Sequence, residues 1–505
     1  MATSIKSAAL CGIAAHALTV EADIASGLPG FAVVGLPDAA VSESRDRVRA
    51  AIKNSGFSFP TGRVTVNLAP ADSRKAGAGY DLPIAVAILA SCGFITKLPH
   101  EAIYAGELSL DGSVRPVPGV LAIAEMARES NAPCLFVPVE NAAEAALVPD
   151  IQIIPVGSLL ALALHLEGTR VIDPTPHALP ELNAPEWETD FAAIRGQFTA
   201  KRVLTIAASG GHNILLSGPP GSGKTMLSHA LPGILPPLTY NEALETTRIY
   251  SAAGLLSGGG LVNTRPFRHP HHSASAVAMV GGGASARPGE ISLAHRGILF
   301  MDEFPEFPRS VLEHLREPLE DGTITVSRAA GTNTYPAKFL LVAAKNPCPC
   351  GYAGDPQISC VCSPTRLELY RKKLSGPLID RIDLAADVPR QNFSELTAGN
   401  ADENSGSVRE RVIAARERQN TRYAGTKIIT NSDLSARMLP KYCPTTDAAG
   451  KLIGAAVDRF HLSARSYHRL LKVSRTIADL EGAEIIEEKH LAEALQYRPR
   501  VEGVH

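Results

Sequence analysis

The first third of the chain alternates two patterns of apolar positions. Runs in which every second residue, or every residue, is apolar predict strands. Such runs cover residues 18–24, 32–34, 64–68, 135–138 and 151–155. Apolar residues three and four positions apart predict helices. These cover residues 41–55, 82–90 and 159–166. The alternation indicates an α/β or α+β domain over residues 1–168.

Prolines separate this domain from the next part of the chain. Residues 169–190 contain Pro174, Pro176, Pro180 and Pro185. Because proline cannot donate a backbone hydrogen bond and fixes its own φ angle, this density of prolines predicts a stiff linker.

The middle of the chain contains short apolar runs separated by helical patterns. The runs at 213–217, 298–301 and 340–344 are typical of strands buried on both faces, so they predict a parallel sheet. We assign this second domain to residues 191–390. Within it, two alternating stretches around a turn at 328–331 predict a β-hairpin over residues 322–339.

The last part of the chain is first polar and then helical. Residues 391–407 are rich in polar residues and glycine, and we expect a mobile linker there. Helical spacing then predicts an α-helical lid over residues 408–505. Its expected helices cover residues 408–423, 448–460, 466–480 and 487–496.

Composition narrows the class of protein. The 505 residues are 45% hydrophobic and 20% charged, as in an ordinary globular protein. The net charge of −2 provides no general attraction to polyanions, so any nucleic-acid binding must come from locally placed basic residues. No run reaches the roughly 18 apolar residues of a membrane span, and no export signal is evident. We therefore expect a cytoplasmic protein without a membrane partner.

A glycine-rich segment between a predicted strand and a predicted helix is the strongest chemical signal. It consists of Gly218, Pro219, Pro220, Gly221, Ser222, Gly223, Lys224 and Thr225. Its glycines let backbone N–H groups surround a polyphosphate, and the following helix adds its positive dipole end. Lys224 would reach the β- and γ-phosphates of ATP, and Thr225 would bind Mg²⁺. The alternative is a glycine-rich turn that matches the motif by chance, and the strand before it and the helix after it make this alternative unfavourable.

Two further strands supply the expected remainder of an ATP site. Asp302 ends the second apolar run and would hold Mg²⁺, while Glu303 is placed to act as general base on the attacking water. The alternative is that Asp302 and Glu303 are two surface acids that follow a strand and have no role in catalysis. Asn346 follows the third run, where its amide can orient that water. Arg381 precedes a fourth strand-like run and is a candidate arginine finger for a neighbouring subunit, although in a monomer it would only form an ion pair.

Four of the eight cysteines lie within fifteen residues of one another, as Cys348, Cys350, Cys360 and Cys362. In a chain without an export signal, thiolates at this density favour tetrahedral Zn²⁺ over disulfides. A reduced cluster without metal is the alternative. The histidines at His269, His271 and His272 lack the spacing of a metal site, and we expect their loop to face a substrate or a neighbouring subunit.

These motifs together resemble one ATPase family. The segments RPFRHPHHSAS, RPGEISLAHRGILFMDE, NPCPCG and GPLIDRIDL, with the phosphate loop, are similar to the magnesium-chelatase-like branch of the AAA+ ATPases, and to its ComM (YifB) family in particular. The resemblance covers almost the whole chain and departs at Lys345, where the family has methionine. It implies that Arg465 is the sensor 2 arginine that touches the nucleotide. It also implies a homo-oligomeric, hexameric helicase that binds single-stranded and branched DNA and drives branch migration in natural transformation and homologous recombination.

The N-terminal domain resembles a different family. VNLAPADSRKAGAGYDLPIAVAIL, GELSLDGSVRPVPGV and FVPVENAAEAALVPDIQIIPV are similar to the proteolytic domain of Lon-type proteases. Gly79 stands where that family has its nucleophilic serine, and residues 120–124, where the lysine base is expected, contain no lysine. A Ser–Lys dyad needs both groups, so we expect a Lon-like fold without protease activity. A chelatase-type ATPase that remodels a protein or metal-insertion partner is the rival function, although an Asp-x-Ser-x-Ser metal site is not found.

The basic residues that would contact DNA must be few. Arg328 lies at the tip of the predicted hairpin, where related ring helicases place a basic residue in the pore. An exposed turn arginine without a partner is the alternative. If Arg328 does not bind DNA phosphates, Arg265 and Arg268 are the next candidates.

Overall fold

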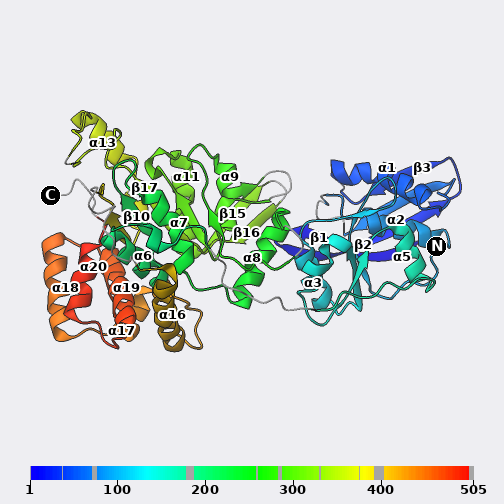
Figure 1. Ribbon diagram of the computed structural model, residues 1–505. Helices are drawn as coiled ribbons and strands as arrows, with labels where there is room; N and C mark the ends of the chain where they lie inside the picture. The colour runs from blue at the N-terminus through cyan, green and yellow to red at the C-terminus, as the bar shows by residue number, and fades with distance from the viewer. Residues whose placement is uncertain are drawn as a thin grey trace.

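The computed structural model describes residues 2–36, 38–70, 75, 77–177, 187–256, 260–282, 287–328, 331–355, 357–374, 376–391 and 403–499. Three regions follow one another along the molecule (Figure 1): an N-terminal α/β domain, a central domain built on a parallel sheet, and a C-terminal group of helices. The predicted mixed α/β fold with a parallel sheet is confirmed. Parts of the two expected linkers, 178–186 of 169–190 and 392–402 of 391–407, lie outside the described residues, and the end of the second linker already belongs to the helix that begins at Ser405.

The N-terminal domain contains a seven-stranded mixed sheet in the order β3-β4-β2-β1-β5-β8-β9. Its strands are β1 (Thr3–Cys11), β2 (Ala14–Ala25), β3 (Gly30–Val34), β4 (Arg63–Ala69), β5 (Ile103–Tyr104), β8 (Cys134–Pro138) and β9 (Gln152–Val156). A separate small hairpin pairs β6 (Glu107–Leu108) with β7 (Val114–Arg115). The helices are α1 (Ala39–Asn54), α2 (Asp81–Ser91), α3 (Val120–Glu129), α4 (Val139–Ala145) and α5 (Leu159–Leu166). The five predicted strands and three predicted helices are present, whereas β1, β5, α3 and α4 were not predicted.

Local interactions explain two of these helices. The side chain of Asp38 accepts a hydrogen bond of 2.8 Å from Val41 N and so caps the first turn of α1. Asp81, at the start of the almost wholly buried α2, is itself buried. Its carboxylate pairs with Arg47 Nε at 2.7 Å, which offsets the cost of burying the charge. This ion pair fixes α1 against α2.

The central domain contains a five-stranded sheet in the order β11-β14-β17-β10-β18. The strands are β11 (Phe267–Arg268), β14 (Ile298–Met301), β17 (Leu340–Lys345), β10 (Ile214–Ser217) and β18 (Leu384–Asp387). All neighbouring pairs are parallel. Its helices are η1 (Phe191–Ala193), α6 (Phe198–Gly210), α7 (Lys224–Ile234), α8 (Tyr240–Ala253), α9 (Ala276–Val280), α10 (Glu290–Leu293), η2 (Phe304–Glu306), α11 (Arg309–His314), α12 (Arg316–Asp321), α13 (Pro364–Lys372) and α14 (Gly376–Ile379).

Both faces of the central sheet are covered. Ile214 and Leu216 face one side, in an apolar cluster with α6, α7 and the C-terminal helices. Leu215 and Leu299 face the other side, in a cluster with α9, α11 and the hairpin of β15 (Thr323–Arg328) and β16 (Gly331–Pro336). The inner strands β14, β17 and β10, which are covered on both faces, are therefore apolar along nearly their whole length, as the sequence pattern predicted.

The hairpin predicted over 322–339 is confirmed, with six paired positions between β15 and β16. A smaller hairpin joins β12 (Gly281–Gly282) to β13 (Arg287–Pro288). After η2 the chain forms two short helices, α11 and α12, rather than one continuous helix. Pro318 explains the break, because its ring clashes with the carbonyl four residues earlier and it has no N–H to donate.

The C-terminal region is helical, as predicted. It comprises α16 (Ser405–Arg422), η3 (Asn431–Asp433), η4 (Ala436–Met438), α17 (Leu439–Tyr442), α18 (Asp447–Phe460), α19 (Ala464–Glu481) and α20 (Glu488–Gln496). A buried carboxylate, that of Asp479, joins these helices. It forms ion pairs with Arg475, at 3.1 Å, and with Arg422, and it accepts a hydrogen bond of 2.9 Å from Asn431 Nδ2. A buried charge with this many partners fixes one packing of the helices.

The N-terminal domain contacts the central domain at two places. Helix α3 packs against α8, where Gly119 N donates to Ser251 O at 3.0 Å and Ser251 Oγ bonds to the buried Glu144. In addition, the turn between β1 and β2 reaches the large hairpin: Cys11 Sγ lies 3.3 Å from Asn333 Oδ1 on β16. Ile13 from the same turn packs against the apolar cluster beneath that hairpin.

Candidate functional site

Three of the predicted ATP-site groups come together because the central strands are parallel. The phosphate loop follows β10, Asp302 and Glu303 follow β14, and Asn346 follows β17. The carboxyl ends of adjacent parallel strands lie at one edge of a sheet, which is where α/β proteins bind ligands. The order β14-β17-β10 therefore places all three groups at the same edge.

Lys224 connects the phosphate loop to Asn346. Its Nζ donates to Gly218 O at 2.8 Å, to Pro219 O at 2.9 Å and to Asn346 Oδ1 at 3.3 Å. Burial lowers the pKa of Lys224, and Asp302 opposes this effect. The ammonium group thus lies against the backbone of the phosphate loop, beside Asn346.

The two predicted Mg²⁺ ligands are adjacent. Thr225 Oγ1 lies 3.1 Å from Asp302 Oδ2, so a hydroxyl and a carboxylate face the same point. Oxygen ligands of this kind suit Mg²⁺, and the site fits that ion. Gly221 and Gly223 have φ angles of +75° and +95°, which side chains rarely adopt, and a Cβ at either would meet nothing within 4 Å. Open space over a loop of this conformation suits a bound polyphosphate.

Glu303 has a partner that the sequence analysis did not identify. Its carboxylate lies 2.9 Å from His272 Nδ1, and its backbone has a φ of +50°. The ring of His272 lies against that of His271, with 4.1 Å between ring centroids. We expected the histidine loop to face a substrate or another subunit, but His272 contacts the candidate general base. The contact arises because the two-residue strand β11 pairs in parallel with β14, so that the loop after β11 begins at the carboxyl edge of the sheet; no local sequence pattern marks this pairing.

Arg381 and Arg465 lie at the opposite edge of the sheet. Arg381 precedes β18, and its guanidinium pairs with Glu320. Arg465 lies 3.7 Å from the same carboxylate. A strand of four residues spans about 13 Å, so the backbone of Arg381, which precedes β18, lies roughly the length of that strand from the edge that carries the phosphate loop. Within a single chain, Arg465 therefore lies on the side of the sheet away from the phosphate loop, and its contact with a nucleotide stays a prediction.

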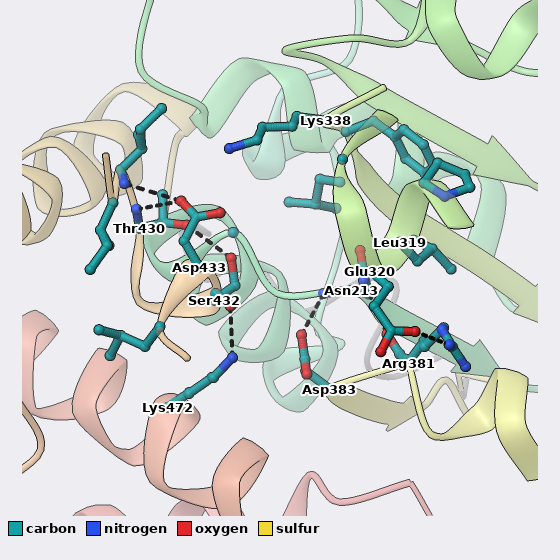
Figure 2. A pocket seen from close by; sticks show the side chains of 18 of the residues that line it. Asn213, Leu319, Glu320, Lys338, Arg381, Asp383, Thr430, Ser432, Asp433 and Lys472 are labelled. Atoms are coloured by element: carbon teal, nitrogen blue, oxygen red, sulfur yellow. Dashed lines mark hydrogen bonds and ion pairs between the residues drawn. The ribbon is translucent and has the colours of Figure 1, made fainter. Parts of the chain in front are cut away.

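These arginines border a cavity of about 770 Å³. Its walls include residues just before the central strands, such as Asn213 and Asp383, together with residues of the C-terminal helices. Figure 2 shows Arg381 and Glu320 facing each other on one side, with Lys472, Ser432 and Asp433 on the other. Many of its charged side chains are basic. They are Arg265, Arg296, Lys338, Arg381, Arg416, Lys427, Arg465, Arg469 and Lys472.

The candidate DNA-contacting arginines are placed differently from one another. Arg265 is held inside the subunit, where it donates to Pro236 O at 2.6 Å and pairs with Glu242 at 3.0 Å. Arg268 forms a two-point ion pair with Glu290, at 2.6 and 2.7 Å. Within one subunit both guanidinium groups are therefore engaged by internal partners, and contact of these fallback candidates with DNA stays a prediction. Arg328 ends β15 and pairs with Gly331, while its side chain and the turn 329–330 lie outside the described residues.

The four clustered cysteines converge. The Sγ atoms of Cys348 and Cys350 are 3.3 Å apart, and Cys360 Sγ lies 3.7 Å from the first and 3.6 Å from the second. With Cys362, all four sulfur atoms lie within 4.8 Å of one another. Thiolates in this arrangement are ligands for a tetrahedral soft metal such as Zn²⁺.

The two positions at which Lon-type proteases carry their catalytic dyad have apolar surroundings or no basic residue in the part of the chain that the structure describes. A Cβ built on Gly79 would lie 3.7 Å from the side chain of Val117, an apolar contact. Helix α3, which covers the region expected to carry the base, contains no lysine. The Lon-like fold itself stays a prediction. Within the described residues, no helix combines the length and apolar character needed to cross a membrane.

Comparison with known proteins places the chain in a family. Models described as "Magnesium chelatase, subunit ChlI", "Subunit ChlI of Mg-chelatase" and "Magnesium chelatase, subunit ChlI C-terminal" match residues 190–396, 20–141 and 402–498. The uncharacterized protein YifB of Salmonella typhimurium is 45% identical over 493 residues, 97% of this chain and 96% of its own.

Two named relatives extend the comparison. The competence protein ComM of Haemophilus influenzae is 44% identical over 503 residues, 98% of this chain and 97% of its own. The magnesium-chelatase 38 kDa subunit of Rhodobacter capsulatus is 27% identical over 338 residues, 60% of this chain and 84% of its own. The chain belongs to the ComM and YifB family of magnesium-chelatase-like AAA+ proteins.

Proposed function

We propose that the protein is an ATP-driven motor that assembles as a hexameric ring on single-stranded or branched DNA and drives branch migration in natural transformation and recombination. The observation that carries the ring is the division of the ATP site between the two edges of the central sheet. Lys224, Asp302 and Glu303 lie at one edge, whereas Arg381 lies at the other. A head-to-tail contact between subunits brings these two edges together, and repeated contacts of this kind close into a ring.

At such an interface, each subunit would complete the site of its neighbour. Glu320 pairs with both arginines within one subunit. The phosphates of a nucleotide bound to the next subunit can replace that carboxylate, because arginine forms strong two-point hydrogen bonds with either group. The buried Nε of Arg381 has no hydrogen-bond partner among the described residues, so a donor is free for such a contact.

The edge with the phosphate loop would carry out hydrolysis. Mg²⁺ bound beside Thr225 and Asp302 would neutralise charge between the β- and γ-phosphates. Lys224 would hold the phosphates, and the Asn346 amide would orient the attacking water. Glu303 would take a proton from that water once its carboxylate leaves His272. Each of these residues follows a buried strand, which keeps their separations fixed.

The large hairpin is the proposed DNA-contacting element. Its buried residues Ile324 and Tyr335 pack in the same apolar cluster as Met301 and Phe304, which flank Asp302 and Glu303. A displacement of the catalytic strand after hydrolysis would therefore be passed to the hairpin. The name of the ComM relative, a competence protein, is consistent with a role in DNA uptake.

A four-way DNA junction tests the proposal. The protein with ATP should dissociate the junction, and Lys224→Ala, which lacks the phosphate-binding ammonium, should not. The chelatase-type alternative, an ATPase that remodels a protein or metal-insertion partner, is favoured by the names of the matching family models. It predicts ATP hydrolysis that DNA does not stimulate and junctions that stay intact.

A further inference from the structure

We propose that the cysteine cluster binds one zinc ion and that this ion holds the phosphate loop and Asn346 in the arrangement that binds ATP. The inference rests on the proposed ATP site but not on the proposed action on DNA. It concerns the segment between β17 and α13, which contains Cys348, Cys350, Cys360 and Cys362.

The first argument is the spacing of the sulfur atoms. With Zn–S bonds of about 2.3 Å, tetrahedral geometry separates neighbouring sulfur atoms by about 3.8 Å. The observed separations among Cys348, Cys350 and Cys360 are 3.3, 3.7 and 3.6 Å. A disulfide would require about 2.05 Å, so none of these pairs is bonded. Three similar separations, rather than one short bonded pair, describe ligands around a common centre.

The second argument is how the chain presents these sulfur atoms. Ala353 N donates to Cys348 Sγ at 3.3 Å, an interaction that stabilises a thiolate ligand. Asp355 accepts from Gln357 N at 2.8 Å and Ile358 N at 3.0 Å, forming the turn that returns the second Cys pair toward the first. Hydrogen bonds to the ligand and to the connecting turn are the support that a metal site requires.

The third argument is that the segment has little else to hold it. Between Asn346 and Ser363, no described residue belongs to a helix or strand. Val361, between the last two cysteines, is 84% exposed, so its side chain adds little to a core. Ordered segments of this length without secondary structure are uncommon, and a metal ion supplies the missing stabilisation.

The coupling to ATP follows from what the segment touches. The backbone of Gly351 lies so close to the phosphate loop that a Cβ there would be 2.5 Å from Pro220 Cδ. Cys348 is two residues after Asn346, which accepts from Lys224. On the far side of the cluster, Tyr370 OH donates to Asn346 O at 3.2 Å. The metal would thus close a loop that begins and ends at Asn346 and lies against the phosphate loop.

The test compares metal content with nucleotide affinity, in the absence of DNA. The wild-type chain should contain about one zinc per chain by elemental analysis. Cys360→Ser/Cys362→Ser should lose the zinc and bind a fluorescent ATP analogue at least about tenfold more weakly. The matched control, Cys92→Ser, changes a cysteine in the N-terminal domain and should retain both properties. Cys362→His replaces one zinc ligand by another and should retain both the zinc and the nucleotide affinity, which separates loss of metal from misfolding.

A second variant separates the contact from the metal. Gly351→Ala should keep the zinc yet weaken nucleotide binding, because the added methyl group clashes with Pro220 and the φ of +89° disfavours alanine. Zinc-free wild-type protein, or a zinc-free double variant with unchanged nucleotide affinity, would overturn the proposal. A wild-type chain that contains zinc but binds no nucleotide would instead refute the proposed ATP site. Failure to act on DNA junctions would leave the metal inference standing.

Discussion

Mixing two inactive variants gives a quantitative test of the divided ATP site. Lys224→Ala removes the phosphate-binding group, and Arg381→Ala removes the group supplied to the neighbour. Every interface of a homogeneous Lys224→Ala ring lacks the lysine, and every interface of an Arg381→Ala ring lacks the arginine, so neither variant can complete a site alone. Loss of an arginine finger costs about 10³–10⁵ in turnover, so each homogeneous ring should be almost inactive as an ATPase.

In a mixed ring, some interfaces recover both groups. A working interface needs an intact Lys224 from one chain and an intact Arg381 from the next. With equal amounts and random assembly, these two requirements are each met half the time, so about one quarter of the interfaces are complete. The mixture should therefore reach about one quarter of the wild-type ATPase rate per subunit, if sites act independently.

Arg465 provides two further mixtures, one of which should recover ATPase activity and one of which should not. Arg465→Ala mixed with Lys224→Ala should recover in the same way, because Arg465 lies at the same edge as Arg381. Arg465→Ala mixed with Arg381→Ala should not recover, since every interface then lacks one of the two arginines. Both outcomes are independent of the absolute rate of the wild-type protein.

The assay is phosphate release after subunits are separated, mixed and reassembled, with ring formation checked by light scattering. Arg45→Ala, which changes an exposed arginine of the N-terminal domain, is the control and should not lower the rate. Near-normal ATPase activity of homogeneous Arg381→Ala rings would refute the reasoning. So would the absence of recovery with Lys224→Ala at every mixing ratio.

Four further predictions concern single residues. Glu303→Gln should bind ATP normally but hydrolyse it about 10²–10⁴-fold more slowly, and near-normal turnover would exclude it as the base. His272→Ala should raise basal ATPase activity, because the imidazole no longer competes with water for the Glu303 carboxylate; an unchanged rate would contradict this. Arg328→Ala should weaken binding to DNA of every sequence. It should also lower the slope of the log binding constant against log salt concentration by about one per contact, whereas unchanged binding would place the DNA contact elsewhere. A hydrogen bond from His295 is the main cause that lowers the pKa of Glu245 to about 2. The contribution of the ionised Glu245 to the free energy of unfolding should be complete above about pH 4.5 and lost toward pH 2. Glu245→Gln should therefore weaken the pH dependence of the unfolding free energy, measured by urea denaturation, over that range.

The sequence predicts the residues of the ATP site best where chemistry and local structure coincide. The phosphate loop needs a strand before it and a helix after it, and both are visible in the pattern of residues 213–231. Asp302 directly follows a wholly apolar run, Asn346 follows another after Lys345, and parallel strands then bring them to one edge of the sheet. No knowledge of distant packing is needed for these assignments.

Positions that depend on long-range packing were not predictable. The contact of His272 with Glu303 depends on β11, a strand of two residues that exists only because it pairs with β14. The placement of Arg465 depends on how α19 crosses the far edge of the sheet, where Arg469 donates to Ile379 O at 3.2 Å. Strand β1 was missed because its serine and alanine residues give a weak apolar alternation, although it lies near the centre of the N-terminal sheet.

The turn between β1 and β2 gives the N-terminal domain a direct thermodynamic connection to the proposed DNA-contacting hairpin. The thiol of Cys11 donates a hydrogen bond to Asn333 Oδ1 on β16, and Ile13 packs in the apolar cluster beneath the hairpin. If DNA displaces the hairpin, these contacts must change, and the docking free energy of the N-terminal domain changes with them. Linkage is reciprocal, so whatever binds or displaces that domain must alter the affinity for DNA by the same factor. A domain without the protease dyad would then serve as the place where a second molecule regulates the motor.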